Sequence, residues 1–300
     1  MTKKTSNTWD DLYQLENKAS FKLRKALSPF YESVKNCYEL GVELPTLIPE
    51  EQQWLDISFS YLYLKRSLTD LREIWKLLLQ GYTSQAATLA ASAYEHALIT
   101  ACMAGSREMS EKLDNMDSLE FPWRVAELCQ RLARQTHEEF TSQGTKVSEE
   151  KYEMWWRAVY GYYKWLCKIK HPTLTSVAYD SVQNQTLKVD WAQSLVKITP
   201  NFSEDDFPNK CFIIFVAVHL INEAIHRLGF VSGINPEDEK VKSWMNRFYP
   251  RRREVWEVYK RVVGEEHTFA IDISYSKLAD EWWEYKQRDE DNSDSGKQDE

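Results

Sequence analysis

Apolar residues recur every three or four positions along most of this 300-residue chain, and that spacing is typical of amphipathic α-helices. After Pro49 the spacing continues as far as Gly81, and a second helical run follows Gly81 directly. Because a glycine between two helical patterns marks a turn, we expect these helices to pack as an antiparallel hairpin. The second helix carries alanines along one face from Ala87 to Cys102, which indicates close approach to a neighbouring helix.

The same spacing, with residues that start and end helices, predicts a mainly all-α fold. Only 9 glycines and 9 prolines occur, which favours long helices over a turn-rich β architecture. One stretch, Thr173 to Pro200, lacks helical spacing, and two runs within it, Ser176–Asp180 and Thr186–Asp190, leave room for one small β-hairpin or an irregular loop. The predicted helices span residues 10–40, 50–80, 83–104, 106–116, 122–140, 148–170, 203–229, 236–248, 252–262 and 278–286.

Residues 1–287 are expected to form a single helical domain, since we find no internal repeat and no linker that divides them. Weak alternation over residues 267–275 predicts a strand near the end of this domain. Residues 288–300 contain no apolar side chain and several acidic ones, so we expect them to form a disordered acidic tail.

The most aromatic segment is the predicted helix over residues 148–170, which runs into the basic step Lys168, Lys170 and His171. A helix that is aromatic on all sides is usually buried or at an interface. The alternative is a platform that stacks a base or cages a cation, with Trp165, Lys168 and Lys170 as its binding candidates. The helix dipole favours a charged imidazole at this end, so His171 is either a capping residue or a general acid/base.

The net charge of −8 argues against a general electrostatic grip on nucleic acid, so RNA could bind only through a local basic patch. Five cysteines without a Cys-x-x-Cys motif indicate reduced, buried thiols in a cytoplasmic protein. The first residues lack the apolar region of a signal peptide. The longest apolar run, Cys211 to Val218, is shorter than the ~20 residues of a membrane span, so we expect no membrane association.

Three residues of the predicted helix over residues 203–229 have a metal-like spacing. His219, Glu223 and His226 lie within about 60° of one another on one helix face. A helical Glu-x-x-His metal site needs a second such motif on a partner helix, which this chain lacks. A polar stripe on a partly buried helix is the competing interpretation. Gly-rich phosphate loops and zinc-protease or hydrolase motifs are also missing from the sequence, so we expect no cofactor.

One segment resembles a known family. Gln80 to Gly105 is similar to the core hairpin of a bacterial family of unknown function with a HEPN-like helical bundle, and the resemblance extends over about residues 50–172. The stretch LAASAYE places Glu95 on the family's glutamate, and KIKHP is similar to a later histidine-containing step that ends at His171. Where the family has an arginine, this chain has Ala91, which puts ribonuclease chemistry in doubt.

A second pattern, Arg131 followed six residues later by His137, fits the loose Arg-x(4–6)-His motif of a helical ribonuclease superfamily. On a regular helix these two side chains point about 120° away from each other, so the pattern is weak evidence for a shared site. The family resemblance over residues 50–172 implies a HEPN-like bundle, to which this chain adds further helices at its C-terminal side.

These observations lead to three hypotheses of function. The first is a non-catalytic interaction or accessory protein, which binds another protein or a second copy of itself, in a bacterial stress, toxin or phage-defence setting that comes from the resemblance alone. The second is a metal-independent ribonuclease, with His171 as general acid/base, Glu95 orienting it, and Lys168 or Lys170 stabilising phosphate charge. The third is a helical metal-dependent enzyme built around Glu223 and His226.

Overall fold

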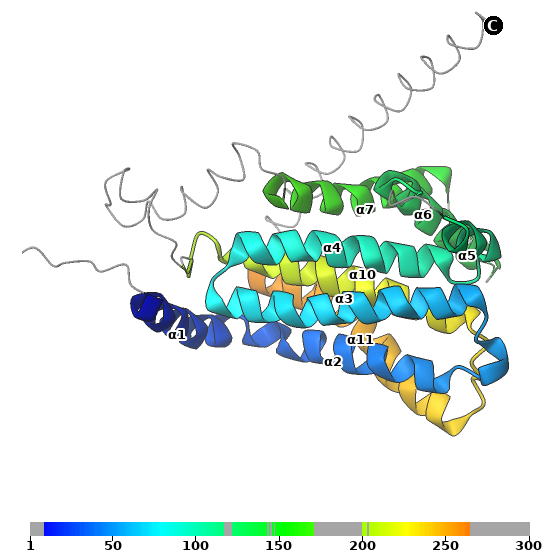
Figure 1. Ribbon diagram of the computed structural model, residues 1–300, viewed down its shortest axis with the longest axis horizontal. Helices are drawn as coiled ribbons and strands as arrows, with labels where there is room; N and C mark the ends of the chain where they lie inside the picture. Colours follow the sequence, from blue (N-terminus) through cyan, green and yellow to red (C-terminus); the bar gives the residue numbers. More distant parts are fainter. Residues whose placement is uncertain are drawn as a thin grey trace, which may run out of the picture.

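The computed structural model confirms the mainly helical fold (Figure 1). The residues that it describes form nine α-helices and contain no β-strand. These described residues are 9–116, 122–142, 144, 146, 148–170, 200–202 and 204–264. The predicted hairpin and strand, the last predicted helix and the acidic tail all lie outside them.

Most helix boundaries agree with the sequence pattern, including the end of a long helix at Gly81. Three 3₁₀ turns add short connections at Ser28–Phe30, Leu44–Leu47 and Glu50–Gln52. The helices are α1 (Trp9–Ala26), α2 (Tyr31–Glu43), α3 (Leu55–Gln80), α4 (Thr83–Met103), α5 (Arg107–Asp114), α6 (Val125–Ser142), α7 (Glu149–Lys170), α10 (Phe207–Val231) and α11 (Glu239–Val263).

Two predictions of where one helix is divided from the next were wrong, and a proline is involved in each. The single helix expected over residues 10–40 is divided into α1 and α2, with Pro29 in the 3₁₀ turn between them. Conversely, the two helices expected on either side of Pro250 form one helix, α11. Buried side chains before and after Pro250, among them Trp244 and Tyr259, hold both halves of α11 on the bundle. Tertiary packing therefore outweighs the local preference of proline to end a helix.

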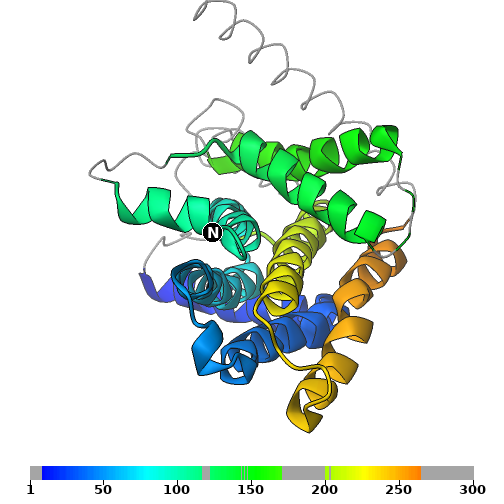
Figure 2. The same cartoon turned by 90° about the vertical axis from the view of Figure 1, so that its right-hand side faces the viewer.

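Helices α4 and α10 form the centre of the bundle. The antiparallel hairpin of α3 and α4 is confirmed, and α10 packs against both of its helices. Figure 2 shows α6 and α7 on one side of this centre, while α2 and α11 lie on the other. The alanine-rich face of α4 is fully buried, as its composition predicted, because small side chains let the neighbouring backbones approach.

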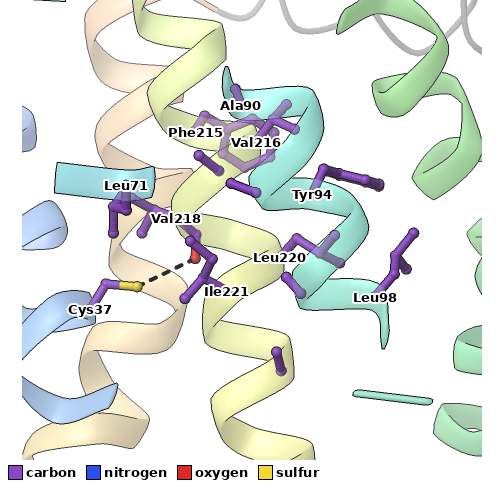
Figure 3. Packing of buried hydrophobic residues seen from close by; sticks show 14 of the residues in the cluster. Cys37, Leu71, Ala90, Tyr94, Leu98, Phe215, Val216, Val218, Leu220 and Ile221 are labelled. Carbon is purple, nitrogen blue, oxygen red and sulfur yellow. Dashed lines mark hydrogen bonds between the residues drawn. The ribbon is translucent and has the colours of Figure 1, made fainter. Parts of the chain in front are cut away.

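The centre of the core is apolar on α10 as well (Figure 3). Phe215, Val216 and Ile221 of α10 and Ala90 and Tyr94 of α4 are all buried in this core. Among the described helices, α10 is long and apolar enough to cross a membrane by length and composition, and 78% of its most apolar window is buried inside the bundle. Its central position accounts for that composition.

The aromatic helix, α7, packs against the core as the first of its two interpretations predicted. Tyr152, Trp156 and Tyr160 are buried, and the hydroxyl of Tyr94 on α4 donates a hydrogen bond of 2.5 Å to the carbonyl of Val159. The five cysteines are also buried and free, as the sequence indicated. Burial raises the pKa of the Cys102 thiol to about 12, which keeps it protonated at neutral pH.

The turn between α3 and α4 yields a first prediction. Gly81 has a left-handed φ of 88°, and an added Cβ would lie 2.9 Å from the backbone nitrogen and oxygen of Asn201. Gly81→Ala should therefore lower the free energy of unfolding by about 2–4 kcal/mol, from backbone strain plus this clash. Urea denaturation followed by circular dichroism measures the change.

Gly144→Ala is the matched control. Gly144 has a similar φ of 81°, but no atom of the residues that the structure describes lies within 4 Å of the position of its added Cβ. This variant should lose only the ~1–2 kcal/mol of left-handed strain. Equal losses in the two variants would show that the contact of Gly81 with Asn201 contributes nothing.

Candidate functional site

Glu95 lies on α4 and faces the last turns of α7. Its carboxylate oxygen Oε1 accepts one hydrogen bond from the hydroxyl of Tyr163 at 2.7 Å and another from the ammonium of Lys170 at 3.1 Å. The Glu95 and Lys170 side chains are about one-third exposed, at 32% and 30%. The structure thus brings together two residues that the sequence singled out separately, and they meet at the surface.

The other residues predicted for this site are placed differently. His171 lies outside the described residues, so its meeting with Glu95 remains a prediction. Lys168 is exposed on α7. The indole of Trp165 packs edge-on against the ring of Phe212 on α10, with ring centroids 4.6 Å apart, which makes it part of the core boundary.

The local chemistry around Glu95 is that of a satisfied carboxylate. Burial, hydrogen bonding to Cys167 and hydrogen bonding to Glu95 raise the pKa of Tyr163 above its usual value, so its hydroxyl remains a donor at neutral pH. His96, the next residue of α4, points to α3 instead, with its Nδ1 3.3 Å from a carboxylate oxygen of Asp70. The arrangement joins α4 to the end of α7 and holds Lys170, the residue that precedes His171 in the sequence.

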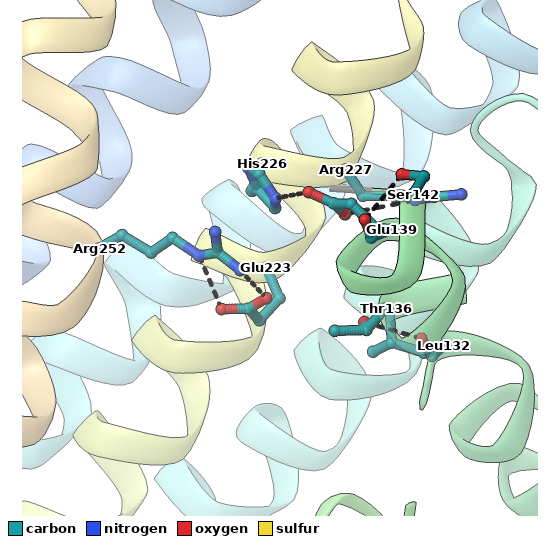
Figure 4. A network of polar contacts seen from close by, with 8 residues as sticks. All are labelled: Leu132, Thr136, Glu139, Ser142, Glu223, His226, Arg227 and Arg252. Carbon is teal, nitrogen blue, oxygen red and sulfur yellow. Dashed lines mark hydrogen bonds and ion pairs between the residues drawn. The ribbon is translucent and has the colours of Figure 1, made fainter. Parts of the chain in front are cut away.

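A row of polar residues on α10, formed by Glu223, His226 and Arg227, contacts charged side chains of two other helices (Figure 4). Glu223 binds the Arg252 guanidinium of α11 through both carboxylate oxygens, with Nε 2.9 Å from Oε1. The Nε2 of His226 lies 3.1 Å from Oε1 of Glu139 on α6. Arg227 approaches the other oxygen of Glu139 at 3.5 Å. The row therefore connects α10 to α6 and α11.

Burial alone would raise the pKa of Glu223, but the Arg252 guanidinium outweighs it and holds this pKa below its usual value. The hydrogen bond with His226 likewise lowers the pKa of Glu139. Burial lowers the pKa of His219, whose ring stacks on Phe215 with centroids 5.5 Å apart. In the part of the chain that the structure describes, no three His, Cys, Asp or Glu residues form a group that could hold a metal ion.

Arg131 and His137 point to different neighbours, as their helical spacing indicated. Arg131 donates to the hydroxyl of Ser106 at 2.9 Å. The His137 ring lies edge-on to Tyr152 of α7, with centroids 6.2 Å apart.

A surface that the sequence did not single out lies on α1, which extends past the α3–α4 connection at one end of the bundle (Figure 1). Trp9 and Phe21 are each 83% exposed and Tyr13 is 62% exposed. The opposite side of α1 packs on the bundle, and Tyr82 donates a 2.5 Å hydrogen bond to the Glu16 carboxylate there. The aromatic spacing was visible in the sequence, but the pattern does not show which apolar residues a neighbouring helix covers.

In comparisons with known proteins, no family model, no curated protein and no solved structure matches this chain. The resemblance to the HEPN-like family therefore remains an expectation from the sequence.

The ion pair between α10 and α11 generates a second prediction. Glu223→Gln should lower the free energy of unfolding at pH 7 by about 2–3 kcal/mol, because it leaves the partly buried guanidinium of Arg252 without its carboxylate. Adding Arg252→Gln should recover part of that loss, since the double variant no longer contains an unpaired charge. The control Glu254→Gln removes an exposed pair with Arg251 on the same helix and should change stability by less than ~1 kcal/mol.

The effect should also depend on pH. A carboxylate whose pKa is lowered by folding stabilises the protein above its unfolded pKa of ~4.3, and this contribution is lost as the pH falls through the lower, folded value. The stability difference between the wild type and Glu223→Gln should therefore be full at pH 7 and shrink below about pH 4. A difference that stays constant over this range would contradict the ionic origin.

Proposed function

We propose that this chain is a non-catalytic interaction module that associates with a second copy of itself through the exposed face of α1. The observation that carries the proposal is the aromatic surface of Trp9, Tyr13 and Phe21. Large aromatic side chains are enriched at the centre of protein interfaces because they bury much area with few rotatable bonds. A contiguous exposed set on one helix is therefore a candidate docking surface.

The charges on α1 favour a second copy as the occupant. Asp10, Tyr13, Phe21 and Arg24 all lie within about 40° of Asn17 around the helix axis, and this whole face is exposed. If two copies of α1 pack antiparallel with Asn17 on the two-fold axis, Asp10 of each copy lies opposite Arg24 of the other. The same register places Tyr13 opposite Phe21. A self-complementary patch of this kind is what a two-fold dimer requires.

The size of the surface sets the expected strength. Each aromatic side chain can bury ~150–250 Å², so the three of them offer roughly 400–500 Å² per copy at their present exposure. Two copies together come close to the ~1,000 Å² at which specific interfaces begin. We therefore expect a concentration-dependent dimer rather than a permanent one.

The internal pairing of the catalytic candidates supports a role without chemistry. Glu95, Glu223 and His226 each contact a side chain of another helix, so their polar groups stabilise the bundle. We further propose, on the sequence resemblance alone, that the bundle is HEPN-like and that the protein works in the bacterial cytoplasm in a stress or phage-defence setting.

The dimer gives a third prediction. Light scattering coupled to size-exclusion chromatography should show the mass rising from monomer to dimer as the concentration increases. Phe21→Glu should raise the dissociation constant by more than about 100-fold, because each dimer loses two buried aromatic contacts and gains two buried charges. Leu62→Glu on α3 is the matched control, since Leu62 is 57% exposed but lies outside α1, and it should leave the dimer unchanged.

A charge exchange tests the register. Asp10→Lys or Arg24→Asp alone should weaken the dimer, because like charges then face each other twice across the two-fold axis. The double variant restores opposite charges and should dimerise like the wild type. A wild type that remains monomeric at all concentrations would rule out this function, and a double variant weaker than both single variants would rule out this register.

The ribonuclease is the second candidate, and one contact favours it. The Glu95 carboxylate holds Lys170, the residue directly before His171, so an acid, a base and a cation could gather at the end of α7. If this candidate is correct, purified protein should cleave RNA in the presence of a metal chelator. His171→Ala should then slow cleavage by ~10²–10⁴-fold, as removal of a general acid/base does. Lys151→Ala, an exposed residue at the start of α7, is the control, and intact RNA after long incubation with the wild type would remove the candidate.

A further inference from the structure

A pocket of about 570 Å³ lies between α6, the start of α7, the last turns of α10 and the two residues, Gly105 and Ser106, that follow α4 closely. Three arginines line it: Arg131 and Arg134 from α6, and Arg227 from α10. Trp123 and Tyr152 contribute aromatic surface to the same pocket. Its volume is within the range of ~300–1,000 Å³ that small-molecule sites occupy. We call this the α6 pocket.

The arginines retain donors for a ligand. A guanidinium has five N–H donors. Among the described residues, the Arg131 guanidinium donates one hydrogen bond, to the hydroxyl of Ser106, and the carboxylate of Glu108 lies 4.0 Å from it. Arg227 contacts Glu139 at 3.5 Å, which is a weak pairing for a side chain that is only 16% exposed. Arg134 is an exposed side chain that lies 5.7 Å from the centroid of the Tyr152 ring and also interacts with the charges of Glu138 and Glu149.

Two buried polar atoms of the lining provide an independent observation. Within the described part of the chain, neither Nε of Arg227 nor Oε1 of Gln135 has a hydrogen-bond partner. Buried polar atoms are nearly always satisfied in folded proteins, and exceptions are typical of places where a missing water, ion or ligand completes the bonding. Both atoms belong to residues that line the α6 pocket.

The acidic residues of the pocket limit the size of the ligand. Glu127 accepts a hydrogen bond from the backbone nitrogen of Arg124 and so caps the first turn of α6. Glu138 is exposed on the same helix, and its charge faces Arg134. Because these two carboxylates line the pocket together with three arginines and the chain has a net charge of −8, the pocket offers a local positive charge and not an extended basic surface. Such a site suits one compact anionic group.

We propose that the α6 pocket binds a small phosphorylated molecule that carries a ring. Arg131, Arg134 and Arg227 would hold its phosphate group, since guanidinium groups bind phosphate oxygens in pairs of hydrogen bonds. The ring would lie against the indole of Trp123, because aromatic faces favour stacking. This inference does not depend on the α1 dimer.

The test uses the full chain and three probes: adenosine monophosphate, inorganic phosphate and adenosine. Calorimetric titration at constant ionic strength should show that adenosine monophosphate binds more tightly than inorganic phosphate, and that adenosine does not bind. Arg131→Gln and Arg134→Gln should each weaken binding of the nucleotide by about tenfold or more, as loss of a charge-assisted hydrogen bond does. These two variants change exposed or partly exposed side chains, and circular dichroism verifies that they are folded.

Arg72→Gln is the matched control, because Arg72 is an exposed arginine of α3 outside the pocket. It should bind the nucleotide like the wild type. Equal weakening in Arg72→Gln and Arg131→Gln would indicate nonspecific anion binding and overturn the proposal. So would the lack of binding of either phosphate probe at millimolar concentration, equal affinity for adenosine and its monophosphate, or no gain in affinity from the ring over inorganic phosphate.

Discussion

The close packing of α4 against α3 and α10 is the constraint on which the rest of the structure depends. Alanines on α4 allow the backbones to approach, and the apolar side chains of α10 fill the remaining space. Because both helices are buried on most sides, their few polar residues must find partners in adjacent helices. Glu223 and His226 illustrate this requirement, since they contact side chains from two different helices of the outer layer.

A buried polar cluster fixes how α4 and α10 sit along each other. Asp206, directly before α10, accepts a 2.5 Å hydrogen bond from the hydroxyl of Thr83 at the start of α4. It also pairs with the ammonium of Lys210, and Asp206 and Lys210 are both 0% exposed. Burial lowers the pKa of Lys210 despite the carboxylate beside it. The ion pair lies within the start of α10 and would survive a shifted register, but the buried Asp206 carboxylate would lose its hydrogen bond from Thr83, so that bond favours one alignment of the two helices.

The sequence predicted those parts of the fold in which buried residues recur at regular helical spacing. The helices on either side of Gly81 and the aromatic α7 carry long, regular patterns, and their positions were confirmed. Pro29 and Pro250 have the same local preference, yet one lies between two helices and the other inside α11, although buried residues flank both of them. Local chemistry alone does not contain that information.

The same limit applies to the candidate sites. Helical spacing placed His219, Glu223 and His226 on one face, but the partners that define their role, Arg252 and Glu139, come from helices distant in sequence. A single sequence reveals which residues share a face, whereas it does not reveal what lies opposite. For this reason the α1 surface and the α6 pocket became visible only in the structure.

The two proposed binding surfaces lie at opposite ends of α4. Tyr82, which contacts α1, directly precedes this helix, and the pocket-lining Gly105 and Ser106 follow it. The 21 residues of α4 separate them by about 31 Å. Coupling between two sites requires an element that has two alternative arrangements. A helix packed closely on α3, α7 and α10 does not readily provide one. Self-association and ligand binding should therefore be independent properties, so that evidence against one leaves the other intact.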